Sequence, residues 1–577
     1  MYISLTKKER LLKIKYAIIV FFIALSGIVL RLVYLQIKQN VTLASQGSKN
    51  CIRTEVIPPL RGNLYDNSGV LLASNRPMFD LYWHGAYKTT DKNGFDALLS
   101  RIEFLLGLKD QQLSRSRVSF AAKHGLSTLL STDLSFEQLS KISERAEDFP
   151  YLLIKQRFER IYPHKKMASH ILGYLSRVEK IGCSGLEKYF DKELAGQNGY
   201  AVNIINSVGR SLELREGEQP KSGRDLVLTI NFALQQLAED TFEEGQSGAF
   251  ILMEPETGAL QVFASYPSFD PNIFLTPISE EDWESKLSEY NPLQNRAVSC
   301  LYPPASLFKL VTLSAGLEEG VIRPESTFNC NGFVKFCGRK YFCKCRTGHG
   351  VLATAEGIAV SCNVHCFEIG KMLKVDTFAD YAFRFGLGNK TGFLLPERSG
   401  LVPTSLWKRQ VKKEQWWLGE NLSVSIGQSY LLVTPLQMAR MISAVAVGYL
   451  SKPRILQEEP EVREPLRLSS STLHFLREAM RKVVTIGSGR KLNWVKGFNV
   501  YAKTGTAQTC ALTLERTQRE HYEHGWTAAI FQYKNEKPLV CVVLLENTGT
   551  ASKSVDYIVK FLRKYRAMRQ EQEKFNA

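Results

Sequence analysis

The chain has 577 residues, of which 44% are hydrophobic and 11% aromatic, and a formal net charge of +17. That composition is typical of globular proteins, but the length exceeds what one hydrophobic core supports, so we expect two or more folded domains. The positive charge would suit nucleic-acid binding by a cytosolic protein. No dense block of Lys and Arg stands out beyond the N-terminal flank, however, and the apolar segment described next places the rest of the chain outside the membrane, which excludes nucleic acid as a partner.

An uncharged apolar segment, YAIIVFFIALSGIVL, covers residues 16–30, and its apolar character continues to residue 37. This is about the ~20 residues that cross a bilayer as a helix, with Arg31 near the end where it reaches the interface. The residues before it include five cations, Lys7, Lys8, Arg10, Lys13 and Lys15. The positive-inside rule therefore predicts a cytoplasmic stub at 1–15, a membrane anchor at 16–37 and an external remainder. The alternative, a cleaved signal peptide, is disfavoured because the apolar run is long and ALSGIVLRL offers no small-residue cleavage site.

Strands and helices are predicted in several segments after the anchor. PPLRGNLYDNSGVLLASN (58–75) predicts two short extended segments around a turn, and residues 95–190 have mixed α/β character without catalytic patterning. A second hairpin pairs 249–253 with 260–264 across a Pro-Glu-Thr-Gly turn. Near the other end, GFNVYAKTGTAQ, GWTAAIFQY and PLVCVVLLEN predict three strands, followed by a helix from about residue 555. Strands at both ends with helical sequence between them predict one antiparallel sheet closed by distant parts of a single domain.

The stretch YPPASLFKLVTLSAGLEEG places a serine and a lysine three residues apart at the head of a predicted helix. At 100° per residue, Ser306 and Lys309 fall on the same stripe as the following leucines, which a globular helix turns toward its core. A buried lysine in the first turn also opposes the helix macrodipole, and such local conflicts tend to occur at functional sites. The spacing alone is weak, because S-x-x-K recurs at Ser4, Ser405 and Ser488.

Two further motifs complete a candidate catalytic set, Ser361-Cys-Asn363 and Lys503-Thr-Gly505. Each has a rival copy in the chain, S-x-N at 48–50 and K-T-G at 390–392. Context favours the Lys503 copy, because it ends an alternating apolar strand, whereas FGLGNKTGF is a glycine-rich turn.

These residue types together indicate acyl transfer through a serine ester. A serine hydroxyl attacks a carbonyl only if its proton is taken, and a lysine with an ordinary pKa of ~10.4 cannot take it near neutral pH. Burial and a second cation lower the pKa of a lysine. Lys309 has the burial, and Lys503 would be that cation. Ser361 would relay a proton to the departing amine, and Asn363 would hold an amide of the donor chain.

The strand that carries Lys503 also offers a place for the end of a substrate. With a period of two, Lys503 and Gly505 share one face of the strand and Thr504 and Thr506 the other. We expect Thr504 and Thr506 to bind a terminal carboxylate, and Gly505 to leave room for substrate against the strand. The backbone N–H groups of Ser306 and Thr506 would form the oxyanion hole.

The ordered triplet S-x-x-K, S-x-N and K-T-G is the signature of penicillin-binding proteins and serine β-lactamases. Further segments extend the likeness over nearly the whole chain after residue 55: RGNLYDNSG, GCSGLEKYF, GRDLVLTIN, YPSFDPN, NRAVSCLYPPASLFK, FGLGNKTG, SIGQSYLLVTPLQMA and AKTGTAQ. The chain resembles the class B penicillin-binding proteins, and among them the elongation-type penicillin-binding protein 2. It departs from their pattern at Ala305, where glycine is common before the nucleophile, and at Asn231, which replaces a frequent aspartate. Neither departure removes a catalytic group.

The resemblance implies an α+β multidomain architecture. After the anchor we expect an elongated α/β pedestal of the dimerisation type at 38–225, a transpeptidase domain at 226–565 with a five-stranded antiparallel sheet flanked by helices, and a polar tail at 566–577. The implied activity is that of a serine D,D-transpeptidase which cross-links peptidoglycan stem peptides during cell elongation, with D-Ala-D-Ala as acyl donor, β-lactams as inhibitors and no cofactor for catalysis. The implied location is the bacterial inner membrane with a periplasmic catalytic domain. The implied partners are a RodA-type membrane glycosyltransferase and the elongation machinery.

Other functions remain open at this point. A D,D-carboxypeptidase or a β-lactamase would hydrolyse the same serine ester, although no deacylating glutamate can be assigned and the long pedestal suits a synthase better. A non-catalytic scaffold or a β-lactam sensor would not cross-link at all. Rapid release of a labelled penicillin would indicate a hydrolase, and the absence of an adduct at Ser306 would indicate a pure scaffold.

Six of the 11 cysteines fall within residues 330–366, together with two histidines. Outside the membrane such a density predicts disulfides, and the alternative is a tetrahedral zinc site of thiolates and an imidazole. The spacing C-x-C-x-x-x-H is not a standard zinc-finger pattern, so both interpretations remain open. Some elongation-type relatives carry a zinc-binding insertion before S-x-N. That resemblance implies a structural zinc site formed by Cys330, Cys343, His349 and Cys362.

Overall fold

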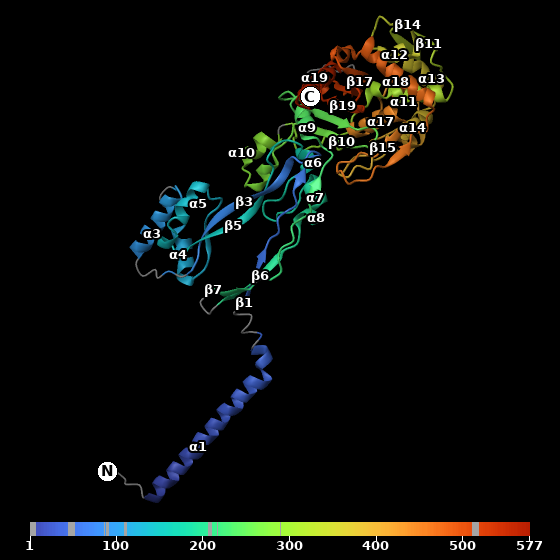
Figure 1. The fold of residues 1–577 in the computed structure, drawn as a ribbon. Coiled ribbons are helices and arrows are strands. Elements are labelled where there is room, and N and C mark those ends of the chain that lie inside the picture. Colours follow the sequence, from blue (N-terminus) through green and yellow to red (C-terminus); the bar gives the residue numbers. More distant parts are fainter. Residues whose placement is uncertain are drawn as a thin grey trace. The chain divides into compact units, whose positions relative to one another are not determined.

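Figure 1 shows the computed structural model of the chain, which describes residues 7–43, 45, 52–85, 87, 92–108, 112–205, 211–215, 217–288, 290–509 and 518–576. The chain folds into two compact units. The first comprises residues 1–60, 76–159 and 196–222, and the second comprises 61–75, 160–195 and 223–577.

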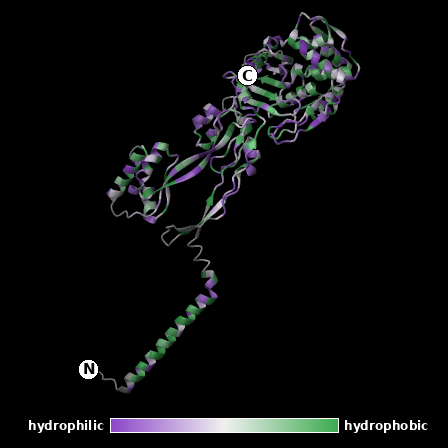
Figure 2. Ribbon diagram, in the orientation of Figure 1, coloured by the Kyte–Doolittle hydropathy of each residue, from purple (hydrophilic) through white to green (hydrophobic). Residues whose placement is uncertain are grey.

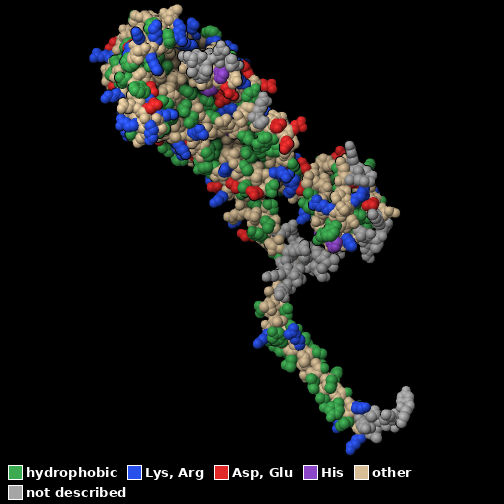
Figure 3. Space-filling view, turned by 180° about the vertical axis from the view of Figure 1, so that it is seen from behind, with side chains coloured by type: hydrophobic (Ala, Val, Ile, Leu, Met, Phe, Trp, Pro, Cys, Tyr) green, Lys and Arg blue, Asp and Glu red, His purple; other side chains and the backbone are tan. Residues whose placement is uncertain are grey.

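The first unit begins with a long apolar helix. α1 (Lys7–Val33) continues into the short π-helix η1 (Tyr34–Lys38). Within Leu11–Lys38, the most apolar 18-residue stretch has a mean hydropathy of 2.6, and none of it is buried. Figure 2 shows hydrophobic residues along most of this helix, and Figure 3 shows its apolar side chains, with Lys and Arg side chains near its ends. Its length and composition are those of a helix that crosses a bilayer, as expected for a single-pass anchor.

The rest of the first unit is a mixed α/β body with its own core. Trp83 lies at the centre of that core, stacked on Tyr151 with ring centroids 5.3 Å apart and T-shaped against Phe95 at 5.7 Å. A three-stranded antiparallel sheet has the order β1-β6-β7. The elements are β1 (Ile52–Ile57), β3 (Leu71–Trp83), α3 (Lys92–Leu105), α4 (Arg115–His124), β4 (Thr128–Ser131), α5 (Phe136–Ser143), η2 (Ala146–Asp148), β5 (Leu152–Ile161), β6 (Gly199–Ile205) and β7 (Ser211–Arg215); β3 and β5 begin or end in the second unit.

The second unit is built on a five-stranded antiparallel sheet of order β10-β9-β19-β18-β17. Its strands are β9 (Gly248–Met253), β10 (Leu260–Tyr266), β17 (Phe498–Ala507), β18 (His524–Tyr533) and β19 (Leu539–Leu545). The predicted hairpin is confirmed as β9 and β10, and the three predicted C-terminal strands as β17 to β19. β9 pairs directly with β19, with Ile251 opposite Val542. The N- and C-terminal parts of this domain therefore close one sheet, as predicted.

Both faces of this sheet are buried, which explains the continuous apolar run of β19. Alternate residues point to opposite sides. Phe250 and Val543 join one core with α9 (Phe232–Glu239) and α19 (Ser552–Asn576). Ile251 and Val542 join the larger core, which contains residues of α11 (Lys309–Glu318) and α17 (Pro435–Val447). The predicted C-terminal helix thus begins at Ser552, and the described part of the predicted polar tail continues it.

Helices and short strands cover the sheet and connect its ends. The remaining elements of the second unit are β2 (Leu64–Tyr65), α6 (Ser169–Leu172), α7 (Gly185–Tyr189), α8 (Asp191–Ala195), β8 (Leu226–Val227), η3 (Pro271–Leu275), α10 (Glu280–Trp283), η4 (Glu284–Ser288), η5 (Ala305–Leu307), α11 (Lys309–Glu318), β11 (Thr327–Cys330), β12 (Phe333–Phe336), β13 (Arg339–Phe342), β14 (Gly350–Ala353), α12 (Thr354–Ala359), α13 (Asn363–Met372), α14 (Val375–Arg384), α15 (Ser405–Trp407), η6 (Lys408–Lys412), α16 (Leu418–Ser425), α17 (Pro435–Val447), β15 (Tyr449–Ser451), β16 (Arg463–Pro465), α18 (Ser470–Thr485), η7 (Arg490–Trp494) and η8 (Arg519–His521).

A buried ion-pair cluster joins two segments of the predicted pedestal within the second unit. Glu187, from GCSGLEKYF, accepts hydrogen bonds from Arg61 Nε at 2.6 Å and Arg160 Nε at 2.7 Å. Arg61 comes from RGNLYDNSG, and its Nη2 also pairs with Asp191 at 2.8 Å. Since Glu187 is fully buried, its charge requires both arginines. The motifs RGNLYDNSG and GCSGLEKYF, which carry no candidate catalytic residue, therefore have a structural role: they supply charged side chains to this cluster.

Candidate active site

The candidate nucleophile lies on a strained turn at the start of a buried helix. Ser306 is in the 3₁₀ turn η5, and α11 begins at Lys309, one turn later. Ala305 has φ +49°, a left-handed conformation that is uncommon for alanine. Its N–H donates to Gly427 O at 2.9 Å, and a Cβ on Gly427 would lie only 2.1 Å from Ala305 O. The contact with Gly427 therefore fixes the turn, although residue 305 is not the glycine that this conformation favours.

Lys309, Ser361, Asn363 and Lys503 converge at one point. Lys309 Nζ donates to Asn363 Oδ1 at 2.8 Å, to the Ser361 carbonyl at 2.8 Å and to Ser361 Oγ at 3.4 Å. Lys503 Nζ donates to the same Ser361 Oγ at 3.0 Å and to Thr504 O at 3.0 Å. The Ser361 hydroxyl thus lies between the two lysine nitrogens. Ser361 itself has φ +56°, which turns the chain sharply before α13.

Both lysines are fully buried, and their surroundings disfavour the charged form. Burial lowers the pKa of Lys309. Burial, and then the charge of Lys309, lower the pKa of Lys503 well below its usual value. The exposed Lys344 adds a smaller lowering to both pKa values. Both lysines are therefore buried beside Ser361, and the charge of Lys309 acts on Lys503; that Lys503 is the cation which lowers the pKa of Lys309 stays a prediction.

The structure does not join Ser306 to Lys309 by a hydrogen bond. Among the described residues, the half-buried Ser306 hydroxyl has no hydrogen-bond partner, so its role as nucleophile stays a prediction. Catalytic hydrogen bonds are often loose before substrate arrives. The structure therefore brings together the side chains of Lys309, Ser361, Asn363 and Lys503. It leaves the Ser306 hydroxyl without a hydrogen bond to the described residues.

The strand β17 presents its K-T-G motif with the predicted alternation. Lys503 points toward Ser361, whereas Thr504 Oγ1 contacts Ser488 Oγ at 2.5 Å on the other side. Gly505 lies where the nucleophile turn packs against the strand. A Cβ at this position would lie 2.8 Å from Leu307 Cδ1, 3.3 Å from Trp526 Cβ and 3.4 Å from Ala305 Cβ. This close packing favours glycine there, and the room that Gly505 leaves for substrate stays a prediction.

Ser488 is a site residue that sequence reasoning missed. It appeared only as the head of another S-x-x-K match, yet its lysine, Lys491, pairs with Asp556 at 2.6 Å instead. Ser488 N–H donates to Ala359 O at 3.2 Å, which fixes its position close to the S-x-N turn. No local pattern predicts a contact between residues 488 and 504, because it depends on how α18 packs on β17.

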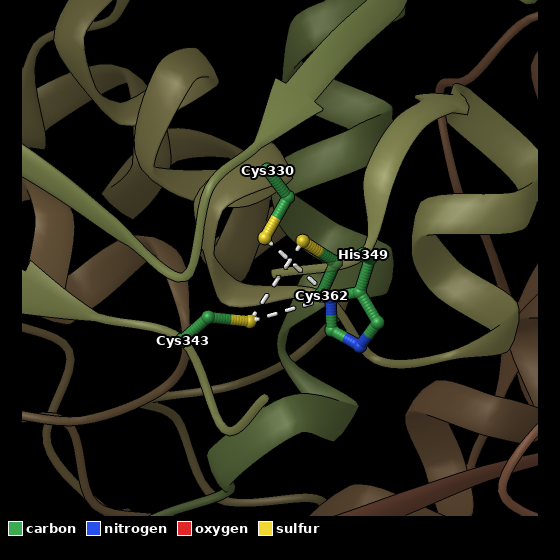
Figure 4. A group of neighbouring side chains, drawn as sticks. All are labelled: Cys330, Cys343, His349 and Cys362. Atoms are coloured by element: carbon green, nitrogen blue, oxygen red, sulfur yellow. Dashed lines mark hydrogen bonds between the residues drawn. The ribbon is translucent and has the colours of Figure 1, made fainter. Parts of the chain in front are cut away.

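The four side chains proposed as zinc ligands meet in one cluster (Figure 4). Their sulfur and nitrogen atoms all lie within 4.8 Å of one another. Sγ atoms of Cys330 and Cys343 lie 3.5 Å and 3.6 Å from His349 Nδ1, and the Cys343 and Cys362 sulfurs are 3.9 Å apart. Tetrahedral zinc with Zn–S ~2.3 Å and Zn–N ~2.0 Å places neighbouring ligand atoms about 3.5–3.8 Å apart. The donor set and its spacing therefore fit zinc.

The same distances do not fit disulfides. A disulfide requires sulfurs about 2.05 Å apart, and each of the nine cysteines in the described part of the chain is a free thiol. Cys337 is exposed and Cys366 is fully buried. The hydrogen bond between Cys343 and Cys362 lowers the pKa of the Cys343 thiol to about 4 and raises that of Cys362.

The second histidine of this region lies outside the cluster. His365 packs T-shaped against Phe328 at 4.8 Å, and among the described residues its ring nitrogens have no hydrogen-bond partner. Burial lowers its pKa to about 4, so the ring is neutral at physiological pH.

The cysteine cluster is contiguous with the S-x-N motif. Cys362 separates Ser361 from Asn363, and Asn363 N–H donates to Cys343 Sγ at 3.4 Å. Asn363 Nδ2 donates to Phe342 O at 3.3 Å. The cluster therefore supports the backbone of two residues that contact Lys309.

The chain matches known proteins along most of its length. A family model described as penicillin binding protein transpeptidase domain matches residues 248–562, and one described as penicillin-binding protein dimerisation domain matches residues 56–228. The peptidoglycan D,D-transpeptidase MrdA of Acinetobacter baumannii is 29% identical over 95% of this chain and 86% of its own. MrdA of Escherichia coli is 27% identical over 96% and 94%, respectively.

Solved structures agree with these relatives. The complex between penicillin-binding protein 2 and MreC from Helicobacter pylori aligns with a TM-score of 0.75 and 26% identity, over 90% of this chain and 99% of that one. A peptidoglycan synthase complex, described as coordinating polymerization and crosslinking, aligns with a TM-score of 0.75 and 29% identity, over 96% and 98%. The five-stranded sheet, the converging motifs and these matches lead to one assignment. The chain belongs to the penicillin-binding proteins, as a class B member of the penicillin-binding protein 2 type.

Proposed function

We propose that this protein is an elongation-type peptidoglycan D,D-transpeptidase that joins stem peptides through an ester on Ser306. Its donor would be a stem peptide ending in D-Ala-D-Ala. Thr504 and Thr506 on β17 would bind the terminal carboxylate, and Asn363 would hold an amide of the donor chain. The backbone N–H groups of Ser306 and Thr506 would stabilise the oxyanion.

Acylation requires one proton to leave Ser306 and one to reach the departing amine. The neutral amine of Lys309 accepts the Ser306 hydroxyl proton as Oγ bonds to the carbonyl carbon of the penultimate D-Ala. The C–N bond then breaks, and a proton passes through the Ser361 hydroxyl to the nitrogen of the released D-Ala. An ester at Ser306 remains.

Transfer reverses these roles with a second stem peptide. Its amine attacks the ester carbonyl, the amine proton passes to the same base, and Ser306 leaves with a proton. The product is an amide between the two peptides. Water in place of the amine would give the carboxypeptidase outcome.

The observation that carries this proposal is the Ser361 hydroxyl between two buried lysines whose pKa values are lowered. The test is labelling of the full-length protein with a fluorescent penicillin, followed by mass spectrometry of the adduct. We expect a stable adduct on Ser306 that is lost in Ser306→Ala. Ser405→Ala, in another S-x-x-K copy, is the matched control and should label normally.

Labelling alone does not separate a transpeptidase from a hydrolase or a sensor. Stem peptides with and without an acceptor amine make that distinction. A transpeptidase forms the cross-linked dimer and releases penicillin slowly. Fast penicillin turnover would indicate a hydrolase, and an adduct without cross-linking would indicate a sensor.

We also propose that Cys330, Cys343, His349 and Cys362 hold a structural zinc ion. The support is a donor set of three sulfurs and one imidazole nitrogen at tetrahedral spacing. Bound zinc would supply a cross-link between the segments that carry its ligands, not a reaction step. Metal analysis of protein purified with and without reductant should give about one equivalent of zinc in both. Mass-mapped disulfides among these four cysteines would refute the site.

The membrane orientation and the partner are part of the same proposal. The cations at the start of α1, before its apolar stretch, favour a cytoplasmic N-terminus and a periplasmic catalytic domain. The partner would be a RodA-type membrane glycosyltransferase, since residues after the anchor match dimerisation and transpeptidase domains. Protease accessibility in intact and permeabilised cells tests the orientation, and co-purification from membranes tests the partner.

A further inference from the structure

The hairpin β12–β13 has one face that packs and one that does not. Val334 and Tyr341 are opposite each other and face inward: Val334 is buried, and Tyr341 lies T-shaped against Phe367 of α13 at 5.9 Å. This inner face therefore fastens the hairpin to the helix that begins with Asn363.

The outer face carries two phenylalanines and two lysines. Phe333 is opposite Phe342, and Lys335 is opposite Lys340, so a strand period of two places all four on the same side. Phe333 and Phe342 are 39% and 45% exposed, with ring centroids 6.2 Å apart. Two large apolar side chains are thus left in water beside two cations.

The charges on this hairpin are unbalanced. Residues 326–355 contain five Lys or Arg residues and no Asp or Glu. All five are exposed, and none of them forms an ion pair within the part of the chain that the structure describes. Like charges directly opposite one another, as at Lys335 and Lys340, destabilise a hairpin. A local cost of this kind is expected where a ligand supplies the missing charge.

Cations also lie over both exposed rings. Lys340 Nζ is 4.8 Å from the Phe333 centroid, and the Arg346 guanidinium is 4.0 Å from that of Phe342. These contacts hold the cationic groups in place on the outer face while leaving their outer hydrogen-bond donors available to an anion.

The hairpin lies at the point where the proposed donor chain would leave the catalytic groups. In the proposed function, the donor runs from its terminal carboxylate at Thr504, past Ser306, to Asn363. Asn363 Nδ2 donates to Phe342 O, so the next surface along that path is the end of β13. The charge of Lys344, which follows, acts on both buried lysines, and it therefore lies close to them.

We propose that Phe333, Lys335, Lys340, Phe342 and Arg346 form a subsite for the acyl-donor stem peptide, binding its carboxylate-bearing residues upstream of D-Ala-D-Ala. The phenylalanines contact the peptide's aliphatic parts, and the cations pair with its carboxylates. This inference rests on the proposed transpeptidase function. It deepens that function, because it assigns donor recognition to the segment that the cysteine cluster holds.

The test compares a donor that reaches the hairpin with one that does not. Full-length wild type and Lys335→Gln/Lys340→Gln are acylated with a fluorescent penicillin, with a pentapeptide that ends in D-Ala-D-Ala and has a free carboxylate at its second residue, and with the same peptide amidated there. Lys496→Gln/Lys564→Gln removes two exposed lysines elsewhere and is the matched control.

We expect the double variant to react with penicillin at the wild-type rate and to lose about tenfold in kcat/KM for the acidic peptide at low salt. The loss should shrink with salt and should be absent for the amidated peptide. Lys335→Glu/Lys340→Glu should reverse the preference between the two peptides. The control variant should match wild type throughout.

Three outcomes would overturn the subsite: unchanged kinetics on the acidic peptide, equal losses on both peptides, or intact kinetics with lost binding of a membrane partner. A slower penicillin reaction in the double variant would show general damage to the site and would also count against it. If wild type reacts with penicillin but with neither peptide, the transpeptidase function itself fails, and the penicillin arm separates the two failures.

Discussion

Replacement of Lys503 by glutamine should move the pH dependence of acylation rather than abolish it. Both Nζ atoms contact Ser361 Oγ, at 3.4 Å and 3.0 Å. The two charges therefore lie within about 6.4 Å of each other, which corresponds to a repulsion of about 2–3 kcal/mol at an effective dielectric constant of ~20. Removing that repulsion favours protonated Lys309, so its pKa rises and less of the neutral base is present at pH 7. The expected loss there is about 30- to 150-fold.

The assay is the rate of acylation by a fluorescent penicillin from pH 6 to 10. In wild type the rate should rise with pH and level off, with the rising limb below the ordinary pKa of lysine, because burial lowers that of Lys309. In Lys503→Gln the limb should lie at higher pH, and the two rates should approach each other in alkali. A Lys503→Gln profile that is lowered equally at every pH, with no displaced limb, would refute the electrostatic role. Lys496→Gln should leave the profile unchanged.

Three further changes test other parts of the structure. Cys343→Ser should prevent binding of the proposed zinc ion and slow acylation, since Asn363 N–H loses its sulfur acceptor; a Cys343→Ser protein that keeps one equivalent of zinc or acylates at the wild-type rate would contradict this. Glu187→Gln should lower the free energy of unfolding by about 3–5 kcal/mol because it leaves the buried Arg160 without its anion and Arg61 with Asp191 alone; the exposed Glu573→Gln should change it by about 0–1 kcal/mol, and similar shifts for both would argue against the cluster. Ala305→Gly should keep the acylation rate within about twofold, whereas Ala305→Val should lose at least about tenfold, because a β-branched residue resists positive φ; equal rates for the two variants would show that the turn relaxes.

The sequence predicted those parts of the fold that depend on periodicity. Alternation in β17 and the turn between β9 and β10 are local signals, and all three strands formed as expected. Burial of Lys309 also followed from its place on the apolar stripe of α11. The pairing of β9 with β19 needed only the argument that strands at both ends of a domain share one sheet.

The parts that sequence reasoning missed depend on packing between distant segments. Ala305 adopts a left-handed conformation that an alanine in the sequence does not predict, because its N–H donates to the neighbouring Gly427 carbonyl. A Cβ at residue 505 would crowd Leu307, which no local pattern brings to the strand. Ser488 reaches Thr504 only through the position of α18. The cysteine spacing allowed disulfides or zinc, and the separation of the sulfurs, which the spacing does not give, supports the zinc site that we propose.

The direct pairing of β9 with β19 has a consequence for how the protein is made. Their partners are separated by roughly 290 residues, so the central strand of the sheet is synthesised last and the domain cannot close before translation is almost complete. Until then β9 and β10 form a ribbon that is apolar on both faces and has an open edge, which is a template for aggregation. We therefore expect the nascent chain to need a holding chaperone, and ribosome-stalled chains that stop before residue 539 to be degraded rather than to fold.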